Sequence, residues 1–198
     1  MLPVQRKVSI AAIATVAALG ATGVQAQTMT AQQFMDACRT NPANTVLLTQ
    51  QTKLQSGVWA PFTTPTGCTV ILGSGASFEL DDTRLIFGGT FTVQGGQNGK
   101  VAVSKGAIEA PAVALNLTGT ESEFQMDDAR VIATTGNLSL QFGEKGKMEI
   151  KNSGGWYQPR LAARRGTFTF TAGAFFNGAM VQSGVHGAAG MNFNFNGF

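Results

Sequence analysis

Two acidic pairs are the residues of this chain whose type and spacing most directly suggest chemistry. Asp81-Asp82 and Asp127-Asp128 lie 46 positions apart, each after a short run of alternating apolar residues. Paired carboxylates can coordinate Ca²⁺, and two carboxylates can divide the acid and base roles of a glycoside hydrolase. A metal or catalytic site is therefore one interpretation of these pairs, and a repeated structural feature is the other.

Repetition around the pairs favours the structural interpretation. Segments 78–86 and 124–132 share the pattern Phe-x-apolar-Asp-Asp-x-Arg-apolar-Ile at an offset of 46 residues. A shift of the sequence by half that offset, 23 residues, also aligns apolar residues with apolar residues. In this 23-residue register, Lys105 separates Asp82 from Asp128, with about 4.8 Å between neighbouring coils. Because surface ion pairs of this kind are common and individually weak, we predict a solvated, charge-balanced ladder.

The neighbouring column is also mixed in charge. An intervening coil separates its like-charged carboxylates, and its members in order are Asp81, Ser104, Asp127 and Lys151. Arg84 and Arg130 repeat in the same way, so we predict that they are structural as well.

Segment 154–166 breaks the period and lengthens one turn, which predicts an inserted loop. Trp and Tyr can stack on sugar rings, and Arg can bind acidic groups of a polysaccharide. The alternative is a loop folded over the strands, with its aromatic rings packed and its guanidinium groups solvated. The candidate ligand-binding residues of this loop are Trp156, Tyr157, Arg160, Arg164 and Arg165.

His186 is the single histidine, and it lies in a Gly-rich stretch without a nearby acid in the sequence. Such a histidine is typical of a surface or turn position, so we do not expect it to act as a general base. Neither a Gly-x-Ser-x-Gly motif nor a phosphate-binding glycine loop occurs in a strand-to-helix setting. We expect no catalytic residue, metal or cofactor, and we leave enzymatic activity open.

The stretch from Gly166 onward is rich in Gly and holds seven of the 14 phenylalanines. We expect Phe193 and Phe195 on one face of a last strand, with asparagines on the other. Together with Phe198, they would form an edge at which another chain can pair. This edge is the candidate site of self-association into a homo-oligomer or fibre.

Short strands in a repeating coil would position all of these residues. Within each unit of about 23 residues, apolar residues alternate for a few positions and then meet Gly, Asn, Ser or Asp. A short period built from strands alone is typical of a solenoid whose coils stack. We therefore predict an all-β fold, a right-handed parallel β-helix. The alternative is an antiparallel β-sandwich, which also has short, regularly spaced strands.

The start of the repeating region has a different pattern. Thr30 can cap a short helix over 31–38, and Asn41-Pro42 can end it. Stacked strands expose an apolar end and unpaired backbone groups, so a terminal cap is physically required. We predict an N-terminal capping helix in 27–42 and a β-solenoid domain over 43–198.

Residues 1–26 have the pattern of a secretory signal peptide. Arg6 and Lys7 precede an Ala/Val/Ile-rich run, and Val24-Gln25-Ala26 precedes the expected cleavage site. A membrane anchor is the alternative, but the apolar run is shorter than the roughly 20 residues needed to span a bilayer. We expect a mature chain that starts at Gln27 and has no transmembrane segment.

Cleavage at this site would change the charge balance. The chain carries 14 Lys and Arg against 11 Asp and Glu, and without Arg6 and Lys7 the basic residues number 12. A net charge near +1 removes the support for general binding to nucleic acid or anionic membranes.

Both cysteines, Cys38 and Cys68, follow the predicted signal peptide, and export would place them where a disulfide persists. We predict that they pair and join the capping helix to the first coils, at a gain of roughly 3 to 4 kcal/mol in the chain-entropy model. Two buried free thiols are the alternative, because geometry decides whether a bridge can close.

The helix, the strand expected at Thr45–Leu48 and the following coils of 22 to 25 residues resemble the pectate-lyase-like β-helix superfamily. The resemblance covers most of Thr30–Phe198, rests on period and cap, and includes no family-specific motif. It implies a right-handed parallel β-helix. That superfamily contains polysaccharide lyases and hydrolases as well as adhesins and surface proteins, so the resemblance alone does not choose a function.

The favoured prediction is a secreted or cell-surface structural or adhesive protein, of bacterial origin, with the periplasm as the other exported location. The alternative is a carbohydrate-binding or polysaccharide-degrading β-helix protein that uses the loop at 154–166. The expected partners are further copies of the chain and a polysaccharide or cell-surface component.

Overall fold

The structure is a computed structural model, and it places part of the 198-residue chain well enough to describe. The predicted signal peptide and several later segments lie outside that part. The described residues are 27–56, 61–151, 153, 160–163, 165–171, 175–178 and 191–196.

The strands form three sheets, and every strand pair recorded among the described residues is parallel. Sheet A contains, in spatial order, β1 (Gln27–Met29), β3 (Gln51–Gln55), β6 (Ser77–Asp81), β9 (Lys100–Ser104), β12 (Glu123–Asp127), β15 (Lys147–Lys151) and β18 (Phe175–Gly178). Sheet B contains β2 (Thr45–Leu48), β5 (Cys68–Leu72), β8 (Phe91–Gly95), β11 (Val113–Leu117), β14 (Asn137–Phe142), β17 (Arg165–Thr171) and β19 (Met191–Asn196). Sheet C contains β4 (Pro61–Thr64), β7 (Arg84–Phe87), β10 (Ala107–Ala110), β13 (Arg130–Ala133) and β16 (Arg160–Ala162).

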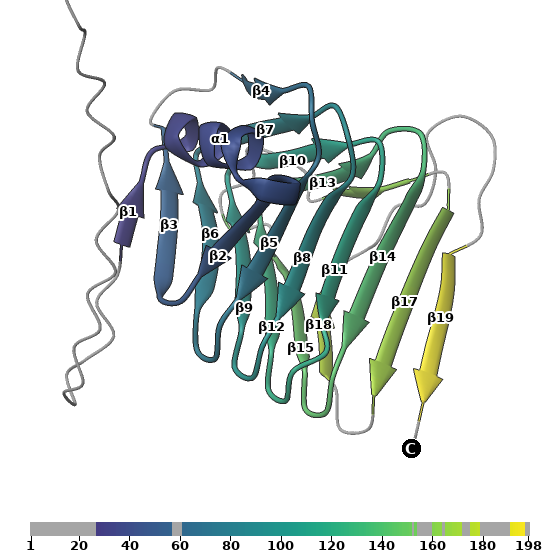
Figure 1. Ribbon diagram of the computed structural model, residues 1–198. Helices are drawn as coiled ribbons and strands as arrows, with labels where there is room; N and C mark the ends of the chain where they lie inside the picture. Colours follow the sequence, from purple (N-terminus) through teal and green to yellow (C-terminus); the bar gives the residue numbers. More distant parts are fainter. Residues whose placement is uncertain are drawn as a thin grey trace, which may run out of the picture.

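From β3 to β17, successive strands belong to sheets A, C and B in turn, so the chain winds in stacked coils (Figure 1). This winding is compatible with a parallel β-helix-like architecture, and the parallel pairing excludes the antiparallel β-sandwich. The predicted 23-residue register is confirmed at three pairs of apolar residues: Phe78 with Val101, Leu80 with Val103, and Leu85 with Ile108.

Alternation along each strand turns one face of every sheet into the core. In β12, Phe124 and Met126 are buried, whereas Glu123, Gln125 and Asp127 remain partly exposed. The same pattern recurs in the strands above and below, so the buried side chains of successive coils form one continuous apolar cluster. Its largest fully buried aromatic residues are Phe34, Phe78, Phe91, Phe124 and Phe142.

Helix α1 (Ala31–Thr40) begins where the sequence predicts, runs two residues past the expected 31–38, and stops before Asn41-Pro42. The Thr30 hydroxyl accepts a hydrogen bond from the Gln33 N–H at 3.1 Å, and the Gln33 side chain accepts one from the Thr30 N–H at 3.0 Å. This reciprocal pair satisfies two backbone donors at the start of the helix. Asn41 is the C-cap, and a short 3₁₀ turn (Pro42–Asn44) follows.

One face of α1 packs into the first coils. Ala31, Phe34, Met35 and Cys38 are buried, and the helix contacts β2, β3, β4 and β5. The ring centroid of Phe34 lies 5.1 Å from that of Phe78, so the helix shares the core of the stacked strands (Figure 1).

The disulfide joins this helix to sheet B. Cys38 of α1 and Cys68 of β5 are bonded, with Cα atoms 5.2 Å apart and 30 positions between them in the sequence. This is the pair that the sequence predicts, and both residues are buried.

Residues 27–29, at the start of the segment 27–42 in which the capping helix is predicted, form strand β1, and helix α1 follows them. Gln27, Thr28 and Met29 pair in parallel with β3. The physical reason is that β3 has an edge whose backbone groups need partners, and a short extended segment supplies them.

Candidate functional site

The second aspartate of each repeated pair occupies a left-handed turn between sheet A and sheet C. Asp82, Lys105 and Asp128 have φ angles of 47°, 48° and 50°. Asp enters this region more easily than most residues, because its short polar side chain can hydrogen-bond locally. The backbone N–H of each turn residue donates to a carbonyl of the next coil, at Ser104, Asp127 and Lys151 respectively. The repeat therefore encodes a turn, which supports the structural interpretation.

The first aspartate of each pair lies on the outer face of sheet A. Asp81 and Asp127 both pair in register with Ser104, as the sequence predicts, so one coil separates the two carboxylates. Asp81 forms an ion pair with Lys53 at 2.7 Å, and Asp127 accepts a hydrogen bond from the Ser153 N–H at 2.8 Å.

Asp128 departs from the predicted solvated ladder. It is 2% exposed, whereas Asp82 is half-buried and Lys105 is exposed. Burial of a carboxylate is costly unless the group is paired or hydrogen-bonded, and Asp128 does interact with other groups of the protein. The column of turn residues is therefore exposed to solvent at Lys105 and buried at Asp128.

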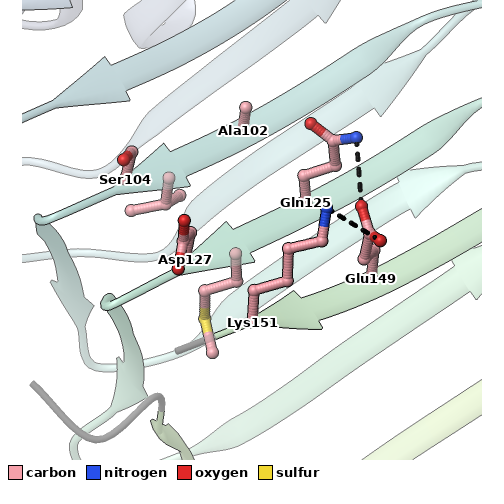
Figure 2. Close-up of a pocket in the computed structure, with 8 residues that line it drawn as sticks. Ala102, Ser104, Gln125, Asp127, Glu149 and Lys151 are labelled. Carbon is pink, nitrogen blue, oxygen red and sulfur yellow. Dashed lines mark hydrogen bonds and ion pairs between the residues drawn. The ribbon is translucent and has the colours of Figure 1, made fainter. Parts of the chain in front are cut away.

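A hollow of about 200 Å³ lies on the outer face of sheet A, over β9, β12 and β15 (Figure 2). Three of its polar side chains, Gln125, Glu149 and Lys151, interact with one another. Glu149 forms an ion pair with Lys151 at 3.0 Å and accepts a hydrogen bond from Gln125 at 3.4 Å. Gln125 also donates to Glu123 at 2.8 Å. Among the described residues, no group of three or more His, Cys, Asp and Glu side chains is placed to hold a metal ion.

The outer face of sheet C carries the repeated arginines. Arg84 donates a hydrogen bond to Glu109 at 2.8 Å, and this bond raises the pKa of the Arg84 guanidinium. Arg130 lies two coils beyond Arg84, in register with Arg160 of β16. Arg84 thus has a structural role, as the repeat predicts.

The predicted loop at 154–166 is shorter than expected. Arg160 begins strand β16 and Arg165 begins strand β17, because the alternation that buries Leu161 and Ala163 resumes there. Arg160 and Arg165 therefore belong to different sheets, C and B, and do not share a loop. The remaining candidate residues Trp156, Tyr157 and Arg164 lie outside the described residues.

The outer face of sheet B was not anticipated as a site, and it differs from the other two in charge. Its seven strands contain one charged residue, Arg165 at the start of β17, whereas every strand of sheet A from β3 to β15 carries at least one. We use the term neutral face for the outward side chains of β2, β5, β8, β11 and β14. Ten of them form two columns: a hydroxyl column (Thr45, Thr69, Thr92, Ala114 and Ser139), in which Ala114 interrupts the hydroxyl groups, and an amide column (Leu47, Ile71, Gln94, Asn116 and Gln141), whose first two members are aliphatic.

An open hollow of about 490 Å³ lies on the neutral face and runs along the amide column. Gln94, Asn116 and Gln141 line it together with Gly95 and Gly96, which carry no side chain. Within the described part of the chain, no side-chain hydrogen bond joins these three amides to another residue. The hollow therefore presents donors and acceptors that are available to a ligand.

The expected last strand exists as β19, which pairs in parallel with β17. Phe193 is in register with Phe168, and Phe195 with Phe170. Among the described strands, β19 is the outermost member of sheet B. Phe198 and His186 lie outside the described residues.

Comparison with protein-family models, curated proteins and solved structures finds no match to this chain. In the part of the chain that the structure describes, no helix has the length and apolar character needed to cross a membrane.

Proposed function

We propose that this chain is an exported structural or adhesive β-solenoid that acts by contact and not by catalysis. Its fold in this proposal is a right-handed parallel β-helix of about 23 residues per coil. Helix α1 is the cap of the N-terminal end, and the disulfide between Cys38 and Cys68 fixes that cap. Residues 1–26 are the signal peptide that directs export.

The observation that carries this proposal is the neutral face. Stacking of five coils in register aligns hydroxyl groups at four of the five positions of one column and amides at three consecutive positions of the other. A face without formal charge can approach another surface without the cost of removing ions from water. A long, repetitive face of this kind makes many weak contacts at once, which is the way that adhesive surfaces gain strength.

Self-association through the C-terminal edge is the second part of the proposal. The outermost strands described in sheets A, B and C at that end are β18, β19 and β16. Phe193 and Phe195 lie on β19, where the backbone groups facing away from β17 suit strand addition by a second copy. Such pairing would build end-to-end assemblies.

A carbohydrate-active role remains the second candidate. It would use Trp156, Tyr157 and Arg164 with the half-buried Arg160. The carboxylates of sheet A give it less support, because Asp81 and Glu149 are ion-paired and Asp127 is hydrogen-bonded.

Retention on the producing cells tests the adhesive role. The mature chain, recovered after export and labelled with a fluorophore, is added back to cells that lack the gene. We expect it to be retained, and we expect the double substitution Gln94→Lys/Gln141→Lys on the neutral face to abolish most of the retention. Gln125→Lys is the matched control on sheet A. A labelled chain that washes off completely would contradict the adhesive role, and a strictly monomeric species in size-exclusion chromatography would contradict self-association.

A further inference from the structure

We propose that the neutral face is a binding site for an uncharged, hydroxyl-rich polysaccharide, and that the amide column lines its principal subsite. This inference rests on the proposed adhesive function and names the chemical class of its partner. The partner's class follows from three properties of the face: its charge, its hydrogen-bonding groups and its apolar end.

Charge separates the neutral face from the rest of the surface. The strands that form the neutral face contain no Asp, Glu, Lys or Arg, whereas the outer face of sheet A carries ion pairs such as Lys53–Asp81 and Glu149–Lys151. An acidic polysaccharide or a nucleic acid would find no cation on this face to neutralise its own charges. Charge complementarity therefore favours an uncharged partner.

The hydrogen-bonding groups of the neutral face favour a partner that carries hydroxyl groups. Each side-chain amide offers two donors and one acceptor, so Gln94, Asn116 and Gln141 can each bond to neighbouring hydroxyls of a sugar. The three residues occupy consecutive coils at about 4.8 Å intervals and line the same 490 Å³ hollow. The hollow is open to solvent along the column, so an extended polymer can lie across it and meet these amides together.

The N-terminal end of the amide column is apolar. Leu47 is 63% exposed and continues into the half-buried Ile71, directly before Gln94. Sugar rings have apolar C–H faces as well as hydroxyl edges, and an exposed leucine beside an amide row matches both. A protein partner that needs an apolar groove would find only Leu47, Ile71 and the small side chain of Ala114 as aliphatic groups in these ten positions of the neutral face.

Titration calorimetry of the exported mature chain with cellohexaose, laminarin and dextran tests the ligand class, with polygalacturonate as the acidic counterpart. We expect binding to at least one neutral glucan and none to polygalacturonate. The double substitution Gln94→Lys/Gln141→Lys should weaken the binding about tenfold, because each lost side-chain hydrogen bond is worth about two- to tenfold in affinity. Gln125→Lys, on the outer face of sheet A, should leave the affinity unchanged.

Three outcomes would overturn the proposal. They are the absence of binding to all three glucans, an equal loss of affinity in Gln125→Lys, and a double variant that changes oligomeric state without changing glucan affinity. The last outcome would identify the neutral face as an interface between copies of this chain. If the chain is retained on cells but binds no glucan, the ligand class is rejected and the adhesive function stands. If the chain is neither retained on cells nor binds a glucan, both the ligand class and the adhesive function are rejected.

Discussion

At the scale of single residues, the backbone conformation of a few turn positions decides which side chains the coils accept. Two columns of left-handed residues run along the stack, one through Asp82, Lys105 and Asp128 and the other through Asn98 and Glu121, among others. Asp and Asn are common choices for such positions, whereas Lys and Glu are not. Lys105 therefore occupies its turn at a conformational cost that its neighbours in the stack offset.

The first prediction concerns that cost. Lys105→Gly should leave stability unchanged or raise it by up to about 1 kcal/mol, because glycine adopts a positive φ without strain. Lys105→Val, with a β-branched side chain at the same position, should lower the free energy of unfolding by about 1–2 kcal/mol. Urea denaturation of both variants measures the difference. Equal stability of the two variants would show that the left-handed turn is not maintained.

Close approach of the backbone imposes a different constraint at Gly88. A Cβ atom there would lie 2.4 Å from the carbonyl oxygen of Pro65 in the preceding coil. We predict that Gly88→Ala lowers the free energy of unfolding by about 1–3 kcal/mol, because backbone atoms must move to admit the methyl group. Gly73→Ala is the control, since a Cβ at Gly73 would find its nearest neighbour at 3.5 Å. A similar loss in both variants would contradict this account.

At the scale of elements, the junction between α1 and the first coils combines a disulfide with aromatic packing. Cys38 and Cys68 close a loop of 30 residues, and Phe34 beside them is completely buried against Phe78. Both contacts join a helix to strands that would otherwise end in an exposed apolar layer. The stability of the helix therefore depends on this junction more than on its own sequence.

The third prediction separates the two contributions. Cys38→Ala/Cys68→Ala should lower the free energy of unfolding by about 3–4 kcal/mol in the chain-entropy model, and the oxidised and reduced wild-type proteins should differ by a similar amount. Phe34→Ala, which keeps the disulfide, should cost about 3–5 kcal/mol by opening a cavity. Guanidinium denaturation with and without reductant measures both. Stability that does not respond to reductant would contradict a structural role for the disulfide.

Elements that follow the repeat were predictable from the sequence, and elements that depend on tertiary pairing were not. Thr45–Leu48 and the helix after Thr30 carry local signals, namely alternation and a cap, and both appear where expected. Strand β1 has no local signal because its three residues are extended only through pairing with β3. The strands at Arg160 and Arg165 were hidden because the insertion before them shifts the period by several residues.

The candidate functional site likewise contains features that the sequence predicts and features that depend on tertiary packing. The column of turn residues Asp82, Lys105 and Asp128 was predictable because the Asp-Asp pair repeats identically. The burial of Asp128 was not, because it depends on packing that the repeat does not encode. The neutral face was missed because its signal is an absence of charge. At one outward position of each of these coils, directly after a buried residue, the chain has Ile71, Gln94, Asn116 or Gln141 and never a charged residue. That regularity becomes visible only when the strands are assigned to separate sheets.

At the scale of the whole molecule, each coil contacts mainly the coils directly before and after it. Strand pairing follows this order in all three sheets, as β6 pairs with β9, β9 with β12 and β12 with β15. Stability of such a stack is approximately a sum of coil terms and nearest-neighbour terms. A whole number of coils can therefore be removed if the register on either side is kept.

The fourth prediction uses the 46-residue repeat for this purpose. Deletion of residues 78–123 joins Ser77 to Phe124, so that Phe124 replaces Phe78 in the core and Asp127 replaces Asp81 opposite Lys53. We expect a folded β protein with a cooperative transition. Its free energy of unfolding and its m-value should both be lower, because two coils of buried surface are missing. Circular dichroism and urea denaturation measure these quantities.

Register is the feature that this deletion must preserve, and a one-residue difference tests it. Deletion of residues 78–122 joins Ser77 to Glu123, which places a carboxylate at the inward position of Phe78 and turns Phe124 to the outer face. Because side chains alternate with a period of two, this slip exchanges the two faces of the junction strand relative to β3, so the coils after the junction no longer match the coils before it. We expect the 45-residue deletion to prevent cooperative folding while the 46-residue deletion permits it. Equal folding of the two chains would mean that stacking in register does not hold this solenoid together.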